Sequence, residues 1–163
     1  STPGVGQPHT EPRLLMSWLT SAFTRENEEA NQNSFDPLPH LAAASGDIRA
    51  LRRYLDGGGN PNHRDPRANK YYETLLHRAV YFGRQGACRL LLRRGADPNS
   101  RSWVLEETPL HVAAARGFAS IVQLLLLHGA DHSLECALAP CVTPLHLAAN
   151  EGSASCVMVL LNF

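Results

Sequence analysis

The same short pattern occurs four times in this chain, at intervals of about 35 residues. In each copy a His is followed two residues later by Ala and six residues later by Gly. A period of this length indicates stacked structural units, because each unit is too small to bury its apolar face alone. The sequence therefore predicts an array of units and not a single closed core. The four marker histidines are His40, His77, His111 and His146.

The third copy shows most clearly what one unit contains. Thr108 is expected to cap a helix, and Pro109 stands at the first helical position, where a missing N–H costs nothing. Gly117 is expected to end this helix and to allow the chain to reverse. A second helix follows and ends at Gly129, where glycine supplies a left-handed cap. Its apolar side consists of Ile121, Val122, Leu124, Leu125 and Leu126.

This pattern resembles the ankyrin repeat, in which the signature Thr-Pro-Leu-His-x-Ala recurs about every 33 residues. The resemblance covers residues 36–163. It implies an all-α ankyrin-repeat solenoid of four helix–turn–helix repeats, with an N-terminal capping helix and irregular, elongated finger loops. The approximate repeats are residues 36–66, 67–100, 101–134 and 135–163.

The first copy departs most from the signature, because Pro37 stands where the capping Thr is expected. Asp36 is a suitable cap in its place. Pro37 and Pro39 would then both lie in the first turn, where backbone donors have no partner within the helix.

Two segments precede the repeats. Residues 1–12 are rich in Pro and Gly and predict a flexible leader. Residues 13–35 predict an amphipathic helix and a linker, with Leu15, Trp18 and Phe23 at helical spacing. This helix either caps the exposed end of the first repeat or binds a partner. A membrane-surface helix is a weaker alternative, because Glu26, Glu28 and Glu29 dominate its polar end. At the other end, we expect the repeat pattern to continue beyond the fragment in the full-length protein.

Composition excludes several classes of partner. Fifteen basic and fifteen acidic residues balance, so we expect no nucleic-acid binding. No window reaches the roughly 18 apolar residues that a membrane span requires, and no signal peptide is evident, so membrane insertion is not expected. Cys88 and Cys156 fall at positions that a repeat buries, which suits reduced thiols. We expect a monomer in the cytoplasm, the nucleus or both.

The loops between copies are longer than the family pattern requires. Spacings between marker histidines are 37, 34 and 35 residues. The additional residues fall in three segments, the first finger (residues 63–73), the second finger (100–107) and the third finger (134–142). The resemblance implies that these fingers and the first helices line a concave face. None contains the usual Asp-Gly turn, so regular hairpins are not expected.

Aromatic and aliphatic side chains gather at positions that, by the resemblance, face outward and do not contribute to the core of the repeat. Tyr, Trp and Arg dominate binding energy in protein interfaces because they bury a large area at low entropic cost. Glu73 and Glu107 beside them are suited to orienting a basic segment of the partner. The predicted partner-binding residues are Tyr71, Tyr72, Glu73, Tyr81, Phe82, Trp103, Val104, Leu105, Glu107, Arg116, Asn150 and Glu151.

Metal binding and catalysis are weaker interpretations. His128, His132, Cys136 and Cys141 are zinc-ligand residue types, but they lack paired C-x-x-C spacing, so we predict an ordinary loop and no cofactor. A His that recurs in every copy is explained by the repeat, where it is expected to hydrogen-bond a neighbouring loop and tie one unit to the next. No Ser or Cys has the context of a catalytic nucleophile, so we expect no enzyme activity.

The sequence therefore predicts a non-catalytic protein–protein interaction module, a scaffold or adaptor that binds a protein or peptide on its concave face. The alternative is the substrate-receptor subunit of a cullin-type ubiquitin ligase. Irregular ankyrin arrays with long fingers resemble those of the SOCS-box family, whose recruiting box would lie C-terminal to this fragment.

Overall fold

The computed structural model describes residues 38–64, 73–137 and 142–163, which belong to one compact unit, Leu38–Phe163. The predicted leader and N-terminal helix lie outside these residues. The described residues form eight helices in four pairs, with no strand beyond isolated bridges. The helices are α2 (Pro39–Ser45), α3 (Ile48–Asp56), α4 (Leu75–Tyr81), α5 (Gln85–Arg93), α6 (Pro109–Ala115), α7 (Ala119–Leu127), α8 (Pro144–Asn150) and α9 (Ala154–Leu161).

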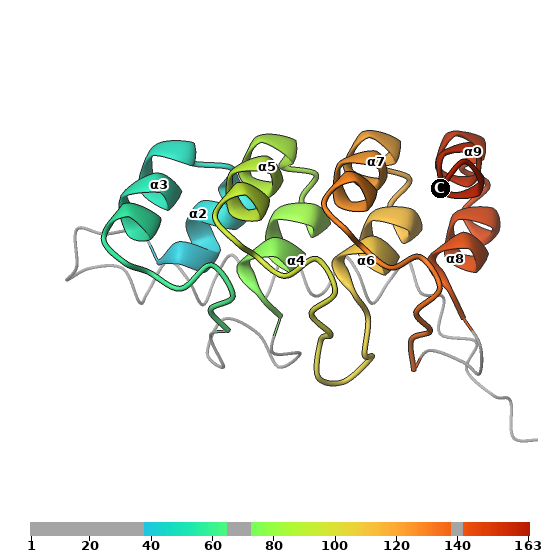
Figure 1. The fold of residues 1–163 in the computed structure, drawn as a ribbon, viewed down its shortest axis with the longest axis horizontal. Coiled ribbons are helices and arrows are strands. Elements are labelled where there is room, and N and C mark those ends of the chain that lie inside the picture. Colours follow the sequence, from blue (N-terminus) through green and yellow to red (C-terminus); the bar gives the residue numbers. More distant parts are fainter. Residues whose placement is uncertain (1–37, 65–72, 138–141) are drawn as a thin grey trace, which may run out of the picture. The chain divides into compact units, whose positions relative to one another are not determined.

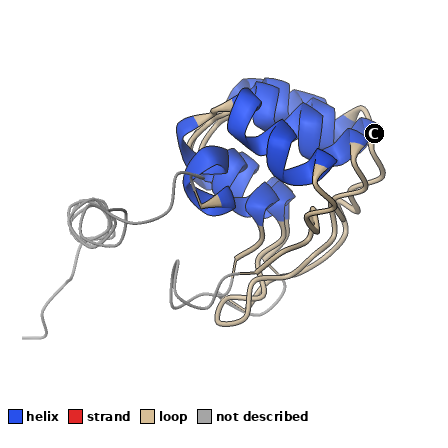
Figure 2. Ribbon diagram, turned by 90° about the vertical axis from the view of Figure 1, so that its left-hand side faces the viewer, coloured by secondary structure: helices blue, strands red, loops and turns tan. Residues whose placement is uncertain are grey.

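The pairs stack in the order of the chain (Figure 1). The first helices, α2, α4, α6 and α8, form an inner row in which each helix contacts the next. The second helices, α3, α5, α7 and α9, form an outer row packed on it. Seen from the side in Figure 2, the finger loops extend from one side of the two rows. This arrangement confirms the predicted helical solenoid. None of the helices described has the length and apolarity needed to cross a bilayer.

Inner helices begin at a cap shared between Thr and His. The Thr74 hydroxyl accepts a hydrogen bond from the His77 backbone N–H at 3.4 Å, and the His77 ring nitrogen Nδ1 accepts from the Thr74 N–H at 3.3 Å. Thr108 and His111 repeat this arrangement. Two otherwise unpaired donors of the first turn are thereby satisfied. Because Nδ1 is the acceptor, Nε2 carries the ring proton.

The same histidines join consecutive copies, as predicted. Nε2 of His77 donates to the Glu107 carbonyl at 3.0 Å, and Nε2 of His111 lies 3.3 Å from the Val142 carbonyl. His40 makes the equivalent contact with the Glu73 carbonyl at 3.3 Å. Each carbonyl belongs to the residue immediately before the next capping Thr. His77 and His111 therefore each cap their own helix and fix the start of the next one.

The first copy differs from the prediction that Asp36 caps its helix. The helix begins at Pro39, and Leu38 holds the N-cap position without a side-chain hydrogen bond. Pro39 is the first residue of this helix. The cause is local, because a residue that precedes proline is driven out of the helical region, and Leu38 has an extended ψ of 132°.

Small and aliphatic side chains fill the space between the rows. Ala79, Ala113 and Ala148 are fully buried where the inner helices meet. Leu125 and the predicted apolar cysteines Cys88 and Cys156 are also fully buried, which confirms the predicted register. Burial raises the pKa of the Cys88 thiol to about 12, so this side chain behaves as a small hydrophobe.

The turns after the outer helices are joined by asparagines. The Asn62 side chain donates to the Gly95 carbonyl and accepts from the Asp97 N–H. Asn99 makes the same pair of bonds to Gly129 and Asp131 one copy later. Histidines near the fingers and asparagines at the turns therefore both tie consecutive copies together.

Candidate functional site

Most of the predicted binding residues that the structure describes fall in two groups, together with Arg78, Phe118 and Glu106, which were not predicted. The turn-end cluster lies where α4 and α6 end, and the finger cluster lies on the second finger. Tyr71 and Tyr72 lie outside the described residues. The turn-end cluster consists of Arg78, Tyr81, Phe82, Arg116 and Phe118. The finger cluster consists of Trp103, Val104, Leu105, Glu106 and Glu107.

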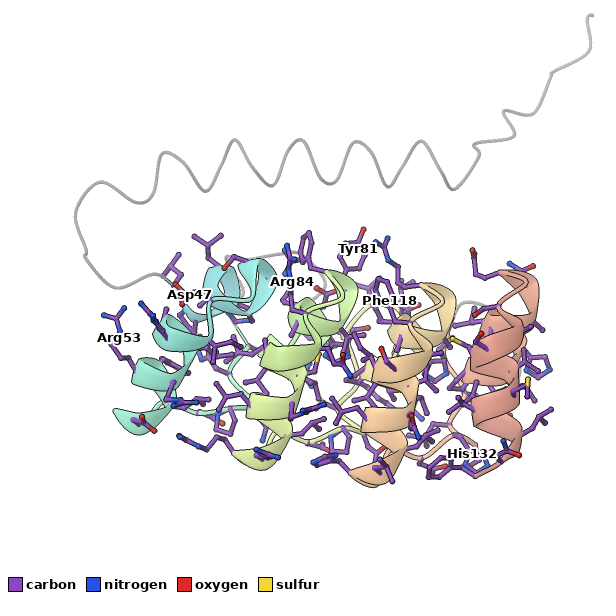
Figure 3. The ribbon with its side chains drawn as sticks, turned by 90° about the horizontal axis from the view of Figure 1, so that it is seen from above. Asp47, Arg53, Tyr81, Arg84, Phe118 and His132 are labelled. Atoms are coloured by element: carbon purple, nitrogen blue, oxygen red, sulfur yellow. The ribbon has the colours of Figure 1, made fainter. Side chains whose placement is uncertain are left out.

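Contacts between rings and guanidinium groups run through the turn-end cluster. Tyr81 and Phe82 meet edge to face, with ring centroids 5.1 Å apart. The guanidinium carbon of Arg116, from the next copy, lies 4.7 Å from the Tyr81 centroid and 5.7 Å from that of Phe118. Figure 3 labels Tyr81 and Phe118 along the same edge of the stack. The ends of α4 and α6, in neighbouring copies, are therefore in contact through Arg116 and Tyr81.

Arg78 connects this cluster to the first finger. Its guanidinium lies 5.1 Å from the Phe82 centroid, and its Nη1 donates to the Glu73 carboxylate at 3.4 Å. The two charged side chains are only 8% and 15% exposed. Glu73 thus has a cation of its own chain beside it.

Arg78 and Phe118 were missed by the sequence prediction. The residue after the marker His is apolar in the other copies, Leu41, Val112 and Leu147, so a charged residue at this position was a usable signal. Phe118 follows the turn glycine, where the copies share no residue type, and no pattern marks it.

Glu107 is half-buried at the base of the second finger. Burial, with repulsion from Glu73 as the smaller cause, raises the pKa of this carboxyl to about 7. Glu107 therefore carries only a partial negative charge near neutral pH. Since Glu73 is paired with Arg78, the site is less acidic than the sequence suggests. That these two carboxylates orient a basic segment of a partner stays a prediction.

The second finger is a tight loop with an apolar tip. The Ser102 N–H donates to the Glu107 carbonyl at 2.8 Å, and the Glu107 N–H donates to the Ser102 hydroxyl at 3.2 Å. Glu106 completes the turn in a left-handed conformation with φ of 51°. Trp103 and Val104 project from the tip and are 69% and 55% exposed, while Leu105 is half-buried.

Neighbouring fingers hold this loop on both sides. Arg64 of the first finger donates to the Arg101 carbonyl at 2.7 Å. Arg101 in turn donates to the Glu135 carbonyl at 3.0 Å, and the Ala137 N–H donates to the Leu105 carbonyl at 2.8 Å. The exposed tip is therefore carried on a loop with fixed supports.

The two clusters lie at opposite ends of the inner helices. Thr74, next to the finger, caps the start of α4, and Tyr81 ends it seven residues later, roughly 10 Å along the axis. Asn150 and Glu151 correspond to Ala115 and Arg116 one copy on, and both are exposed.

The weak metal candidates do not converge. The His128 ring nitrogen Nδ1 lies 2.9 Å from the Leu124 carbonyl, His132 is exposed, and Cys136 is buried. Cys141 lies outside the described residues. Within the part of the chain that the structure describes, no three His, Cys, Asp or Glu side chains gather as a metal site.

Comparison with known proteins gives one family and several relatives. The family described as "Ankyrin repeats (3 copies)" matches residues 39–136 and 110–163. Glycerophosphocholine phosphodiesterase gde1 of Schizosaccharomyces pombe is 31% identical over 116 residues, 69% of this chain and 10% of the relative. Mouse rabankyrin-5 is 31% identical over 72% of this chain and 10% of its own length. Bovine cyclin-dependent kinase 4 inhibitor B is 34% identical over 58% of this chain and 66% of its own.

These relatives share the repeats and differ in the rest of their sequences. The chain spans 10% to 16% of the phosphodiesterase, the palmitoyltransferase AKR1 of Lachancea kluyveri and rabankyrin-5. Some of these names describe enzymes, and others do not. The similarity therefore concerns the repeat array.

Proposed function

The chain belongs to the ankyrin-repeat family, and on this premise we propose that it is a non-catalytic module that binds a partner protein or peptide on its concave face. Ankyrin repeats generally mediate protein–protein interaction. A fold does not by itself assign a function, so the proposal depends on the site.

The observation that carries this proposal is the exposed apolar tip of the second finger. Trp103 is 69% exposed although it is a large aromatic residue, and the loop that carries it is hydrogen-bonded to both neighbouring fingers. A rigid support reduces the entropy lost on binding. The half-buried rings of Tyr81 and Phe82 add a second aromatic contact at the turn ends.

The proposal is tested by selecting binders from a displayed library of random peptides and measuring their affinity by calorimetry. We expect Tyr81→Ala and Trp103→Ala each to weaken binding by at least about fivefold, near 1 kcal/mol, because aromatic anchors dominate interfaces. Arg89→Ala and Arg93→Ala on the outer helix α5 are the matched controls and should bind normally. If these controls lose binding and the aromatic variants keep it, the partner uses the opposite surface.

The cellular location belongs to the same proposal. Cys88 and Cys156 are free and buried, which suits a reducing compartment, the cytoplasm or the nucleus. Imaging of the tagged protein in cells tests this, and secretion into the medium would contradict it.

A further inference from the structure

Arg116 differs from the other arginines around it in how its charge is compensated. Its side chain is exposed, and among the described residues it makes no hydrogen bond and no ion pair. Arg78, by contrast, is paired with Glu73, and Nε of Arg84 donates to the Ala44 carbonyl at 2.9 Å. The hydrogen-bonding edge of the Arg116 guanidinium is therefore available to a ligand.

The guanidinium is nevertheless held in place. It lies 4.7 Å from the Tyr81 centroid and 5.7 Å from that of Phe118, so two rings from successive copies confine it. Contacts of this kind attract the cation to the rings and restrict its rotamers. Arg89 and Arg93 on α5 are exposed arginines for which the described structure shows no ring contact or ion pair. A confined guanidinium loses less entropy when it binds a ligand than these do.

The charges near this position favour an anionic ligand. The carboxylate of Glu73 is already paired with Arg78, whose guanidinium lies against Phe82 of the same cluster. Glu151 occupies the position of Arg116 in the next copy, but forms no ion pair with it in the described structure. A planar guanidinium binds a carboxylate through two parallel hydrogen bonds.

We propose that Arg116 binds a carboxylate of the partner. A Glu or Asp side chain of the bound segment pairs with the free edge of the guanidinium, and an adjoining apolar side chain packs against Tyr81 and Phe82. This inference rests on the proposed function and specifies the partner as an acidic, apolar segment.

The experiment starts with random peptides selected on the wild-type protein and, in parallel, on Arg116→Gln. Peptides selected on the wild type should be enriched in Glu or Asp next to an apolar residue, and those selected on the variant should not. A double-mutant cycle then pairs Arg116→Gln with replacement of the peptide Glu by Gln. Replacing the peptide Glu should cost about tenfold in affinity for the wild type, because the charged pair with Arg116 is lost. The same replacement should cost less than about twofold for Arg116→Gln, because that pair is already absent there.

Further variants separate the effect of a stacked, bidentate guanidinium from the effect of a positive charge alone. Arg116→Lys keeps the charge and should still lose at least about fivefold, since ammonium neither stacks nor binds in bidentate fashion. Tyr81→Leu keeps apolar bulk and should also weaken binding of the Glu peptide. Arg93→Gln is the matched control and should have no effect. Thermal melts check that each variant is folded.

The outcomes are distinguishable. The carboxylate proposal is overturned if replacing the peptide Glu costs the same affinity for the wild type and for Arg116→Gln. It is also overturned if no selected peptide depends on Arg116 for binding. Binding that depends on Tyr81 and Trp103 but not on Arg116 overturns it and leaves the proposed function standing. Dependence on none of the three residues overturns both. A peptide that binds only when its Glu is replaced by phosphoserine shows a phosphate site and contradicts the proposal as stated.

Discussion

The ring of Phe118 covers Gly83, with its Cζ atom 3.0 Å from the point where a glycine Cβ would stand. Phe118 is the first residue after the turn glycine of its own copy, and it rests on the turn glycine of the preceding copy. Arg84 covers Gly46 in the same way, and Ser153 covers Gly117. Glycine is therefore needed at this turn for two reasons. It adopts the left-handed conformation, and its lack of a side chain leaves room for a residue of the next copy.

Gly83→Ala should destabilise the protein by about 2 kcal/mol, from a strained φ of +66° and from displacement of Phe118. Gly95→Ala is the matched control, because its φ is +85° and no atom lies within 4 Å of the added Cβ. Gly95→Ala should be destabilised by backbone strain alone, by about 1 kcal/mol. Chemical denaturation measures both. Equal losses would show that Phe118 moves aside without cost.

Leu125→Ala should lower the free energy of unfolding by about 2–5 kcal/mol, because it opens a cavity at a fully buried position of α7. Leu127→Ala in the same helix is the control. Leu127 is 66% exposed, so its truncation should change stability by less than about 0.5 kcal/mol. A small effect at Leu125 would place this residue outside the core and contradict the register of the repeats.

Glu107→Gln should stabilise the protein at alkaline pH. An unfolded Glu loses its proton near pH 4.5, whereas folded Glu107 holds it until a pKa of about 7. The folded state binds more protons between these values, so its stability falls as the pH rises through them. Gln imitates the neutral acid and removes this loss. Because Glu107 is only half-buried, solvent screening reduces the full linkage energy, and we expect a gain on the order of 1 kcal/mol at pH 8 and none near pH 4. A pH-independent difference would show that the carboxyl titrates normally.

His77 should have the opposite pH dependence. Burial lowers its pKa from the ordinary 6.5 to about 4. The unfolded state therefore binds more protons between these values, and stability falls as the pH is lowered from 6.5 towards 4, by about 3 kcal/mol in total. Glu107→Gln is the suitable background, because the two groups offset each other in the wild type. Protonation is followed by the ring resonances in NMR, and a His77 that titrates near 6.5 would contradict the prediction.

Features encoded within a few residues were predictable from the sequence. Thr108, Pro109 and Gly117 set helix ends through bonds and dihedral angles within one turn, and their recurrence gave the register that places Leu125 in the core. The start of α2 differs from the prediction because Pro39 keeps Leu38 out of the helical conformation, and this steric effect decides the helix start over the capping tendency of Asp.

The charges of the site depend on contacts between copies, and the sequence did not determine them. Whether Glu73 pairs with Arg78, or Glu107 is half-buried, follows from how a finger packs against a neighbouring helix. The confinement of Arg116 between Tyr81 and Phe118 also requires rotamers on two copies. Spacing predicted that these residues lie near each other, but not how their charges are compensated.

The hydrogen bonds that link different copies within the described residues span between 30 and 40 residues, so each joins segments that are about one repeat length apart. His77 reaches the third copy, for example, and Asn62 the second. A change in one junction therefore leaves more distant junctions intact. In evolutionary terms, the residues at the tip of one finger can be substituted while the residues of the other fingers stay unchanged. Binding specificity in such a chain can therefore evolve by substitutions in one repeat at a time.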